Sequence, residues 1–270
     1  MAKKRILYVS HEIKPYFPES DLANAGLMFP KKMNSKGNEI RVFMPRFGSI
    51  NERRHQLHEV IRLSGMNVVI NDLDQPLIIK VASIPAARIQ VYFIDNEDYF
   101  KRKTVFNNKA GKFHKDNDER CLFFCKGVLE TVIKLGWSPD IIHCNDWMSS
   151  LIPLLIKTSY SDRHIFENTK CIFSIYENSF KEKLDKKMID KIVDEDIDKD
   201  MLSSLKSNDY SGLIKIASEY SDAIIRPDKD LNKSLEESIS SISPKNKVHK
   251  IPENEKSVES HYKLYNEILN

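Results

Sequence analysis

Residues 5–45 read RILYVSHEIKPYFPESDLANAGLMFPKKMNSKGNEIRVFMP. The apolar run from Ile6 to Val9 predicts a strand, and residues 22–35 predict a helix that stops at the sequence Lys36-Gly37-Asn38. Residues 39–44 alternate like a second strand, which ends at Pro45. Strand, helix, glycine turn and strand in this order are typical of a βαβ unit, in which the two strands are parallel.

The same alternation continues along the chain. Strands are predicted at 77–82, 89–94, 141–143, 171–175, 223–225 and 248–251, with a turn at Pro85 between the first two. Helices are predicted at 116–134, directly before Gly136, and at 149–158. We therefore expect an α/β fold, with a mostly parallel, doubly wound sheet in a single Rossmann-like domain.

The composition of the sequence divides the chain into three regions. Residues 1–226 are expected to form the Rossmann-like domain, in which the charged stretch 181–210 is a helical insertion. Residues 227–255 are polar and read as a connector, and residues 256–270 read as an amphipathic helix packed back on the domain. The apolar stripe predicted for that helix consists of Tyr262, Tyr265, Ile268 and Leu269.

The composition also excludes several classes of protein. Hydrophobic residues make up 41% of the 270 residues, which supports a core and excludes a disordered chain. The 42 Lys and Arg against 39 Asp and Glu leave a net charge of +3, so we expect no nucleic-acid and no membrane partner. No apolar run approaches the roughly 18 residues of a membrane span, and no secretory signal is recognisable, which favours a cytoplasmic protein.

Signatures of a cofactor or a metal site are absent from the sequence. It contains no Walker loop, no G-x-G-x-x-G and no G-x-S-x-G, and its eight glycines leave little for a phosphate cradle. The four cysteines have no zinc-binding spacing, and we expect them to be reduced thiols: Cys121, Cys125, Cys144 and Cys171. We therefore expect neither a cofactor nor a metal ion.

Two polar clusters follow predicted strands. Ser10-His11-Glu12 comes after the first strand, and residues 143–147, HCNDW, lie at the end of a later one. Ligands of open α/β sheets bind at the carboxyl ends of strands, where carboxylates and aromatic rings together suit a sugar. The alternative is purely structural, with Asp146 capping the next helix and Trp147 in the core.

Five segments, in this order and with similar spacing, resemble one known family. They are residues 8–15 (YVSHEIKP), 30–47 (PKKMNSKGNEIRVFMPRF), 91–100 (VYFIDNEDYF), 116–124 (DNDERCLFF) and 141–147 (IIHCNDW). The segments resemble the bacterial and plant glycogen or starch synthases, which are ADP-glucose glycosyltransferases with two Rossmann-type domains (GT-B). The match is good over residues 3–160 and faint over 170–226.

The resemblance implies an amino-terminal synthase domain and a set of site residues. It implies that Glu12, Asn117 and Trp147 bind substrate, with His143 and Asp146 as residual catalytic candidates. The ligand implied is an α-glucan or ADP-glucose.

The chain departs from the family at the loop that would meet the donor. The family reads KTGGL there, whereas this chain has Pro18, Ser20 and Asp21 at the lysine and the two glycines, and Asn24 at the following aspartate. An acidic side chain repels a diphosphate, so this donor loop is interpreted as degenerate. About 45 residues follow Ile225 and they contain no second βαβ series, so we also expect the donor-binding second domain of the family to be absent. Residues 260–269 resemble the family's own last helix.

Three functional hypotheses follow from the resemblance and the departures. The first is a glycogen synthase-like protein of α-glucan metabolism that does not transfer glucose from ADP-glucose by itself, a pseudoenzyme acting as a glucan- or partner-binding module. The second is an active ADP-glucose:1,4-α-glucan glucosyltransferase completed by a protein partner that supplies a donor domain. The third is a binder of another nucleotide sugar.

Overall fold

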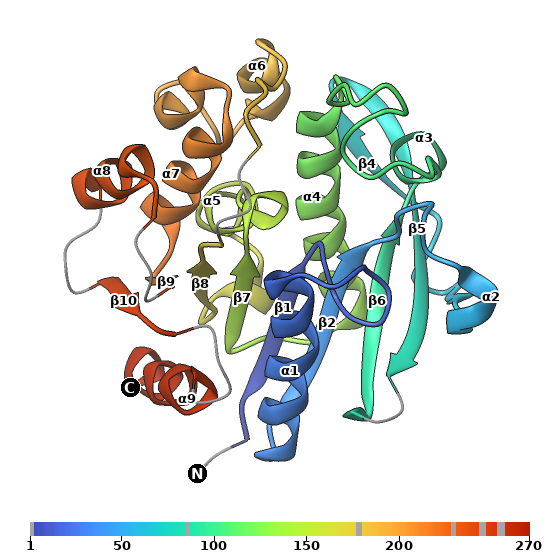
Figure 1. Cartoon of the computed structure of the whole chain (residues 1–270), viewed down its shortest axis with the longest axis vertical. Coiled ribbons are helices and arrows are strands. Elements are labelled where there is room, and N and C mark those ends of the chain that lie inside the picture. Colours follow the sequence, from blue (N-terminus) through green and yellow to red (C-terminus); the bar gives the residue numbers. More distant parts are fainter. Residues whose placement is uncertain (1–2, 85–86, 177–179, 228–230, 243–246, 253–256) are drawn as a thin grey trace.

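The computed structural model describes residues 3–84, 87–176, 180–227, 231–242, 247–252 and 257–270 (Figure 1). Within them a sheet of ten strands has the order β10-β9-β8-β7-β1-β2-β6-β5-β3, and β4 pairs with β5. The strands are β1 (Arg5–Ser10), β2 (Glu39–Pro45), β3 (His58–Glu59), β4 (Met66–Ile70), β5 (Leu73–Ile84), β6 (Ile89–Asp95), β7 (Ile141–Asn145), β8 (Lys170–Ser174), β9 (Ala223–Arg226) and β10 (Val248–Lys250). The predicted turn at Pro85 lies outside the described residues.

Helices connect the strands. They are α1 (Asp21–Ser35), α2 (Glu52–His55), α3 (Glu97–Phe100), α4 (Asn117–Leu135), α5 (Ile152–Lys157), α6 (Met188–Ile192), α7 (Tyr210–Tyr220), α8 (Lys233–Ile242) and α9 (Ser257–Leu269). Short 3-10 turns occupy residues 147–149, 164–166 and 203–207. No helix in the described parts of the chain has the length and apolar character that crossing a membrane requires.

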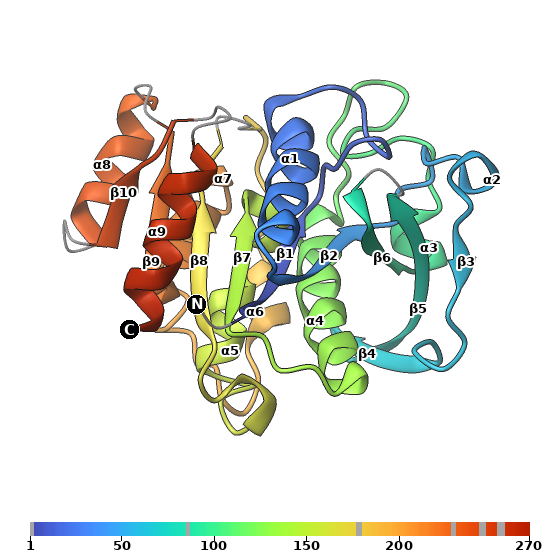
Figure 2. The same cartoon turned by 90° about the horizontal axis from the view of Figure 1, so that it is seen from below.

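The order in which successive strands are added to the sheet reverses at β1. Strands β10 to β6 pair in parallel, and β5 pairs antiparallel with β6. The β1–α1–β2 crossover moves along the sheet one way, while β6–α4–β7 moves the other way. Because parallel crossovers are right-handed, α1 and α4 lie on opposite faces. Helices α4, α5 and α7 pack in succession, and α9 packs beside α1 (Figures 1 and 2). The expected doubly wound α/β fold is confirmed.

Helix α1 begins and ends at the residues that the sequence indicates. Ser20 is its N-cap, and the Ser20 hydroxyl oxygen accepts the backbone N–H of Ala23 at 2.9 Å. After the helix, Gly37 adopts a φ of +87°, a conformation that glycine reaches without the steric penalty of a side chain. The buried face of α1 includes Phe29 and Met33, which pack into the core of the sheet.

A lysine with a buried side chain helps to dock the charged segment 181–210 on the domain. The Nζ of Lys191 on α6 lies 2.8 Å from Asp118 and Glu119 of α4 and 3.0 Å from Asp185. Burial opposes the charge on Lys191, but the hydrogen bonds to these three carboxylates outweigh it and raise its pKa. A charge network, together with the buried apolar side chains of Met188 and Ile192, therefore docks this segment on α4.

Helix α9 buries a different stripe from the one predicted. Its buried side chains include Val258, His261, Leu264 and Tyr265, whereas Tyr262, Ile268 and Leu269 are only half-buried. The observed stripe has the predicted spacing but starts one turn earlier. In it the ring of His261 packs edge-to-face on Phe29, with centroids 4.8 Å apart, so a histidine takes part in this contact.

Several elements have no counterpart in the sequence prediction. One is β4, which forms a hairpin with β5 through Asn71 and Asp72, both with positive φ. Another is α7, capped by Asp209, whose side chain accepts the Gly212 N–H at 3.0 Å. The four cysteines are free thiols and buried.

Candidate functional site

The site lies at the carboxyl edge of the sheet, around the ends of β1, β7 and β8. Open α/β sheets bind ligands where the strand order reverses, and here this point is β1, between β2 and β7. Two neighbouring features occupy this edge. One is a hollow between α1, α9 and the strand ends, which we call the open cavity, and the other is a group of residues around His11 that we call the buried polar cluster.

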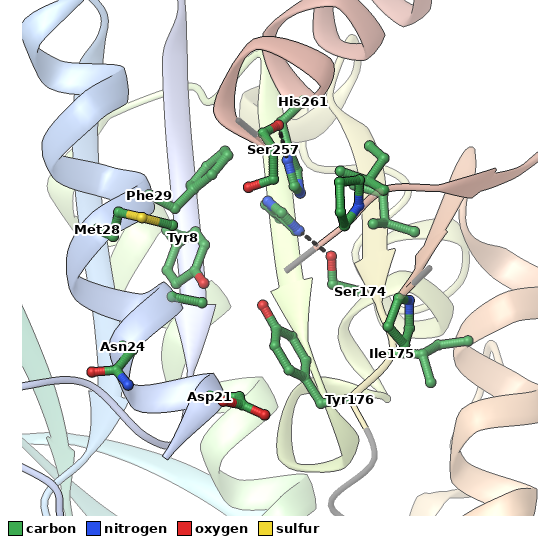
Figure 3. Close-up of a pocket in the computed structure, with 16 residues that line it drawn as sticks. Tyr8, Asp21, Asn24, Met28, Phe29, Ser174, Ile175, Tyr176, Ser257 and His261 are labelled. Atoms are coloured by element: carbon green, nitrogen blue, oxygen red, sulfur yellow. Dashed lines mark hydrogen bonds between the residues drawn. The ribbon is translucent and has the colours of Figure 1, made fainter. Parts of the chain in front are cut away.

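The open cavity has a volume of about 340 Å³, towards the smaller end of ligand pockets. Figure 3 shows its lining side chains, which come from α1, α9, the strands β1, β7, β8 and β9, and the segments that follow β8, β9 and β10. The lining residues are Tyr8, Asp21, Asn24, Ala25, Met28, Phe29, His143, Ser174, Ile175, Tyr176, Ile225, Pro227, Ile251, Pro252, Ser257 and His261.

His143 ties the wall of the open cavity to α9. Its Nδ1 lies 2.6 Å from the hydroxyl oxygen of Tyr265, and its Nε2 lies 2.6 Å from that of Ser174. Burial, followed by the nearby His261, holds the pKa of His143 well below its usual range. His261 is also buried, which lowers its pKa to about 4, and its Nδ1 donates to the Ser257 carbonyl at 2.7 Å. Both rings are therefore neutral at pH 7.

The charge of the open cavity is acidic. Among the lining residues that the structure describes, Asp21 supplies a carboxylate, and none is a lysine or an arginine. Asp21 occupies the first turn of α1, where the partial positive charge of the helix would otherwise attract an anion. The groups that remain for binding are hydroxyl, amide and imidazole groups beside apolar side chains.

In the buried polar cluster, residues from both of the clusters predicted from the sequence lie close together. The His11 Nε2 lies 3.6 Å from Glu12 Oε1 and 4.0 Å from Asp146 Oδ2. The Ser20 hydroxyl donates to the second oxygen of Glu12, and the Tyr210 hydroxyl lies 2.8 Å from Asp146 Oδ1. Burial lowers the pKa of His11 to about 3, so the imidazole is neutral and these contacts are not ion pairs at pH 7.

Burial distinguishes the cluster from the cavity. His11 and Asp146 are 0% exposed, Trp147 is 1% exposed and Glu12 is 6% exposed. Trp147 lies in the core, as the structural alternative expects. Asp146 precedes the 3-10 turn 147–149, but its side chain makes no capping hydrogen bond to that turn. The backbone of Asp146 has a φ of 59° and a ψ of −177°. That region is sparsely populated by residues other than glycine.

The other site residues predicted from the sequence lie in the open cavity, in the buried polar cluster or outside both. His143, Asp21 and Asn24 line the open cavity, while Ser20 joins the cluster through Glu12. Pro18 is exposed and is not a lining residue. Asn117 is buried beside the chain at Phe106, where its amide donates to the Phe106 carbonyl at 3.0 Å and its carbonyl accepts from Arg120 at 2.6 Å. The binding and catalytic roles of all these residues stay predictions.

Several residues of the site carried no signal of their own in the sequence. Tyr8, Tyr176 and Ser174 line the cavity from within or just after strands, and Tyr210 reaches the cluster from α7. Tyr265 was recognised only as part of a packing stripe. In the described residues, no group of three or more His, Cys, Asp or Glu side chains is placed to hold a metal ion.

Comparisons with known proteins give a consistent result. The model of the starch synthase catalytic domain family matches residues 5–236. A glycogen synthase of Chlorobium luteolum is 44% identical over 179 residues, which cover 66% of this chain and 36% of that protein. A glycogen synthase of Chlorobaculum parvum is 40% identical over 188 residues, covering 68% of this chain and 38% of the relative. The chain thus spans little more than a third of these relatives.

A solved structure shares the fold. The catalytic domain of starch synthase IV from Arabidopsis thaliana, bound to ADP and acarbose, superposes with a TM-score of 0.75 at 16% identity. The superposition covers 93% of this chain and 52% of that one.

Proposed function

Because the chain belongs to the starch synthase catalytic domain family, we propose that it binds the end of an α-glucan in the open cavity and does not itself transfer glucose from ADP-glucose. The observation that carries this proposal is the chemistry of the described lining residues, which offer neutral polar groups and a carboxylate but no lysine or arginine. The family suggests the ligand class, and the acidic lining of the cavity favours the neutral acceptor over the charged donor.

A sugar nucleotide needs positive charge, which the described lining of the open cavity does not offer. Diphosphates are held by arginine, lysine or open helix N-termini. At the N-terminus of α1, the backbone N–H of Ala23 already binds Ser20, and the Asp21 carboxylate occupies the first turn. A diphosphate placed there would meet like charge, which disfavours binding of ADP-glucose.

A neutral sugar ring matches the same lining. The rings of Tyr8 and Phe29, stacked with centroids 5.5 Å apart, form an aromatic wall, and Ile175 adds an aliphatic surface. Asp21, Asn24 and Tyr176 offer acceptors and donors for hydroxyl groups. The cavity volume of about 340 Å³ suits a terminal ring rather than a long stretch of glucan. Ser257 and His261 of α9 complete the lining.

Calorimetric titration of the full chain with maltotriose and with ADP-glucose tests the proposal. We expect heat of binding with maltotriose and none with ADP-glucose, and no incorporation of glucose into glycogen by the pure protein. Asp21→Asn should weaken maltotriose binding by about tenfold, the effect of losing one hydrogen bond to a charged group. Asp196→Asn, which removes an exposed carboxylate that does not line the cavity, is the matched control.

The outcomes separate the three functional hypotheses. Binding of ADP-glucose together with glucose incorporation would contradict the proposal and favour a transferase. Binding of a different nucleotide sugar, with no response to maltotriose, would favour a donor-binding protein. Incorporation that appears only after a second protein is added would assign the donor contacts to that partner.

A further inference from the structure

The loop that precedes α4 carries a strong positive charge. Residues 101–115 contain six lysines and arginines and no aspartate or glutamate. The Lys101 Nζ pairs with the Glu97 carboxylate at 3.1 Å. The Arg102 guanidinium pairs with Asp116 through two hydrogen bonds. Four positive charges are therefore left without an ion pair among the residues that the structure describes, on the exposed side chains of Lys103, Lys109, Lys112 and Lys115.

The backbone gives this loop a defined shape. Asn107 and Phe113 form an antiparallel bridge, and Gly111 between them has a φ of +76°, which suits a tight turn. We call residues 103–115 the basic hairpin. The ring of Phe113 stacks on that of Phe180, with centroids 4.8 Å apart and an angle of 28°, and both rings are half-buried. The basic hairpin thus combines exposed lysines with a partly accessible aromatic surface.

A stretch of opposite charge follows α6. Residues 194–200 read DEDIDKD and have five carboxylates against one lysine, a net charge of −4, and we call them the acidic stretch. All five acidic residues are exposed. The Lys199 Nζ pairs with Asp190 of α6 at 2.6 Å, which ties the stretch to that helix. The next side chain, that of Met201, is apolar and 37% exposed.

The basic hairpin and the acidic stretch are complementary in two respects. Four unpaired positive charges on one match a net charge of −4 on the other. Each also has an apolar side chain beside its charges, Phe113 on the hairpin and Met201 next to the stretch. Specific interfaces place apolar contacts inside a polar rim, and a methionine sulfur packs favourably against an aromatic ring.

A second copy of the chain fits these surfaces better than a nucleic acid does. Both surfaces lie near the N-terminal end of α4, because the hairpin leads into that helix and Lys191 binds α6 to its first turn (Figure 1). A long polyanion that approaches the hairpin therefore also approaches carboxylates, which repel it, and the whole chain has a net charge of only +3. A second copy instead offers carboxylates to the hairpin and lysines to the stretch.

We propose that the basic hairpin is a docking surface for the acidic stretch of a second copy of this chain. Met201 of one copy packs beside Phe113 of the other, inside a rim of lysines and carboxylates. The contact joins two different surfaces, so it closes into a dimer about a two-fold axis or continues into longer assemblies. Because exposed charges supply the attraction, the association weakens as the salt concentration rises.

Static light scattering of the full chain measures this self-association. We expect a mean mass above that of the monomer at about 1 mM protein in about 20 mM NaCl. The monomer should return in about 1 M NaCl, where the screening length falls to about 3 Å. The charge reversals Lys109→Glu with Lys112→Glu, on the hairpin, and Glu195→Lys with Asp196→Lys, on the stretch, should each raise the dissociation constant by at least about tenfold.

A control and a mixture identify the two surfaces. Lys31→Glu with Lys263→Glu changes the net charge as much as the hairpin reversal does, but on the exposed sides of α1 and α9, and should leave the association unchanged. Mixing the two reversed variants brings glutamates on one hairpin against lysines on the other stretch. We expect the mixture to associate at low salt although neither variant does so alone, with unchanged circular dichroism spectra throughout.

Several results would overturn this contact. A parent chain that stays monomeric at low salt would contradict it, as would an association that survives both charge reversals. A mixture that stays monomeric would show that the basic hairpin does not take the acidic stretch. Salt-dependent binding of a single-stranded RNA oligonucleotide to a monomeric parent chain, lost in the hairpin variant, would assign the surface to a nucleic acid instead.

Discussion

Ser20 makes hydrogen bonds in two directions at the carboxyl edge of the sheet. Its oxygen accepts the Ala23 N–H and so begins α1, and its hydroxyl proton goes to Glu12 at the end of β1. The side chain therefore couples the start of a helix that lines the open cavity to the buried polar cluster. A glycine here could do neither, since it has no side-chain oxygen.

Replacement of Ser20 measures this coupling. We expect Ser20→Ala to lower the free energy of unfolding by about 1–2 kcal/mol, because the helix loses its cap and a buried carboxylate loses a donor. Ser20→Thr keeps the hydroxyl and should stay close to the parent chain. Urea denaturation followed by circular dichroism gives both values, and equal midpoints for Ser20→Ala and the parent would contradict the coupling.

The buried histidines make stability depend on pH. Burial lowers the pKa of His261 from 6.5 to about 4. Between these values the unfolded chain binds a proton that the folded chain does not, so stability falls as the pH falls from about 6.5 towards 4. Above pH 6.5 the residue is neutral in both states and has no effect. His11 and His143 are shifted in the same direction.

The His261→Gln variant isolates the contribution of one histidine to the pH dependence of stability. Between pH 7 and pH 4 we expect the free energy of unfolding of this variant to fall by roughly 2–4 kcal/mol less than that of the parent. Urea midpoints measured across this range give the comparison, with exposed His164→Gln as the control. Parallel curves for parent and variant would show that His261 is not buried as a neutral ring.

At the scale of elements, α9 is the helix whose order depends most on packing. A helix of 13 residues is marginal in water by itself. Its stability must come from Val258, Leu264 and Tyr265, which are buried against the rest of the domain. Its contact with the sheet is polar as well, because the Tyr265 hydroxyl binds His143 on β7.

Removal of the chain after Pro252 tests the role of α9. Burial of each large apolar side chain contributes about 1.5–3 kcal/mol, so we expect the shortened chain to lose several kcal/mol and to aggregate through the exposed face of α1. Thermal melting and light scattering provide the measurement. A shortened chain that stays monomeric and melts within a degree or two of the parent would mean that α9 adds little.

The elements that could be predicted from the sequence are those with strong local signals. Helices α1 and α4 have stop signals at Gly37 and Gly136, and both glycines adopt the positive φ expected there. Helix α7 was not predicted, because Gly212 and several serines weaken its local helical signal. The turn at Asn71-Asp72 was missed because it lacks the glycine that usually marks a two-residue hairpin.

The site was predictable only in part, for a physical reason. The rule that ligand groups gather at strand ends brings His11 and Asp146 together, and the structure places them 4.0 Å apart. The open cavity needs α9, α1 and the strand ends at once, and no local pattern specifies where α9 docks. The sequence pattern also gives no sign that Phe180 covers Trp147.

At the scale of the molecule, the reversal of strand order at β1 determines where the site lies. It sets α1 and α4 on opposite faces and brings the ends of β1 and β7 together beside α1. The family's fold is kept over 93% of the chain, while the loop that begins α1 is acidic. This shared fold and the acidic start of α1 are the basis on which we propose a neutral ligand.

The most direct test of the open cavity is a maltotriose titration of the Ala25→Trp variant beside the parent chain. Ala25 lines the cavity from α1, so an indole there fills space that a sugar ring needs. We predict that the parent chain binds maltotriose, and that the variant, with an unchanged circular dichroism spectrum, loses at least about tenfold in affinity, as expected for a ligand displaced from its main contacts. Equal affinities for the two proteins would contradict the account.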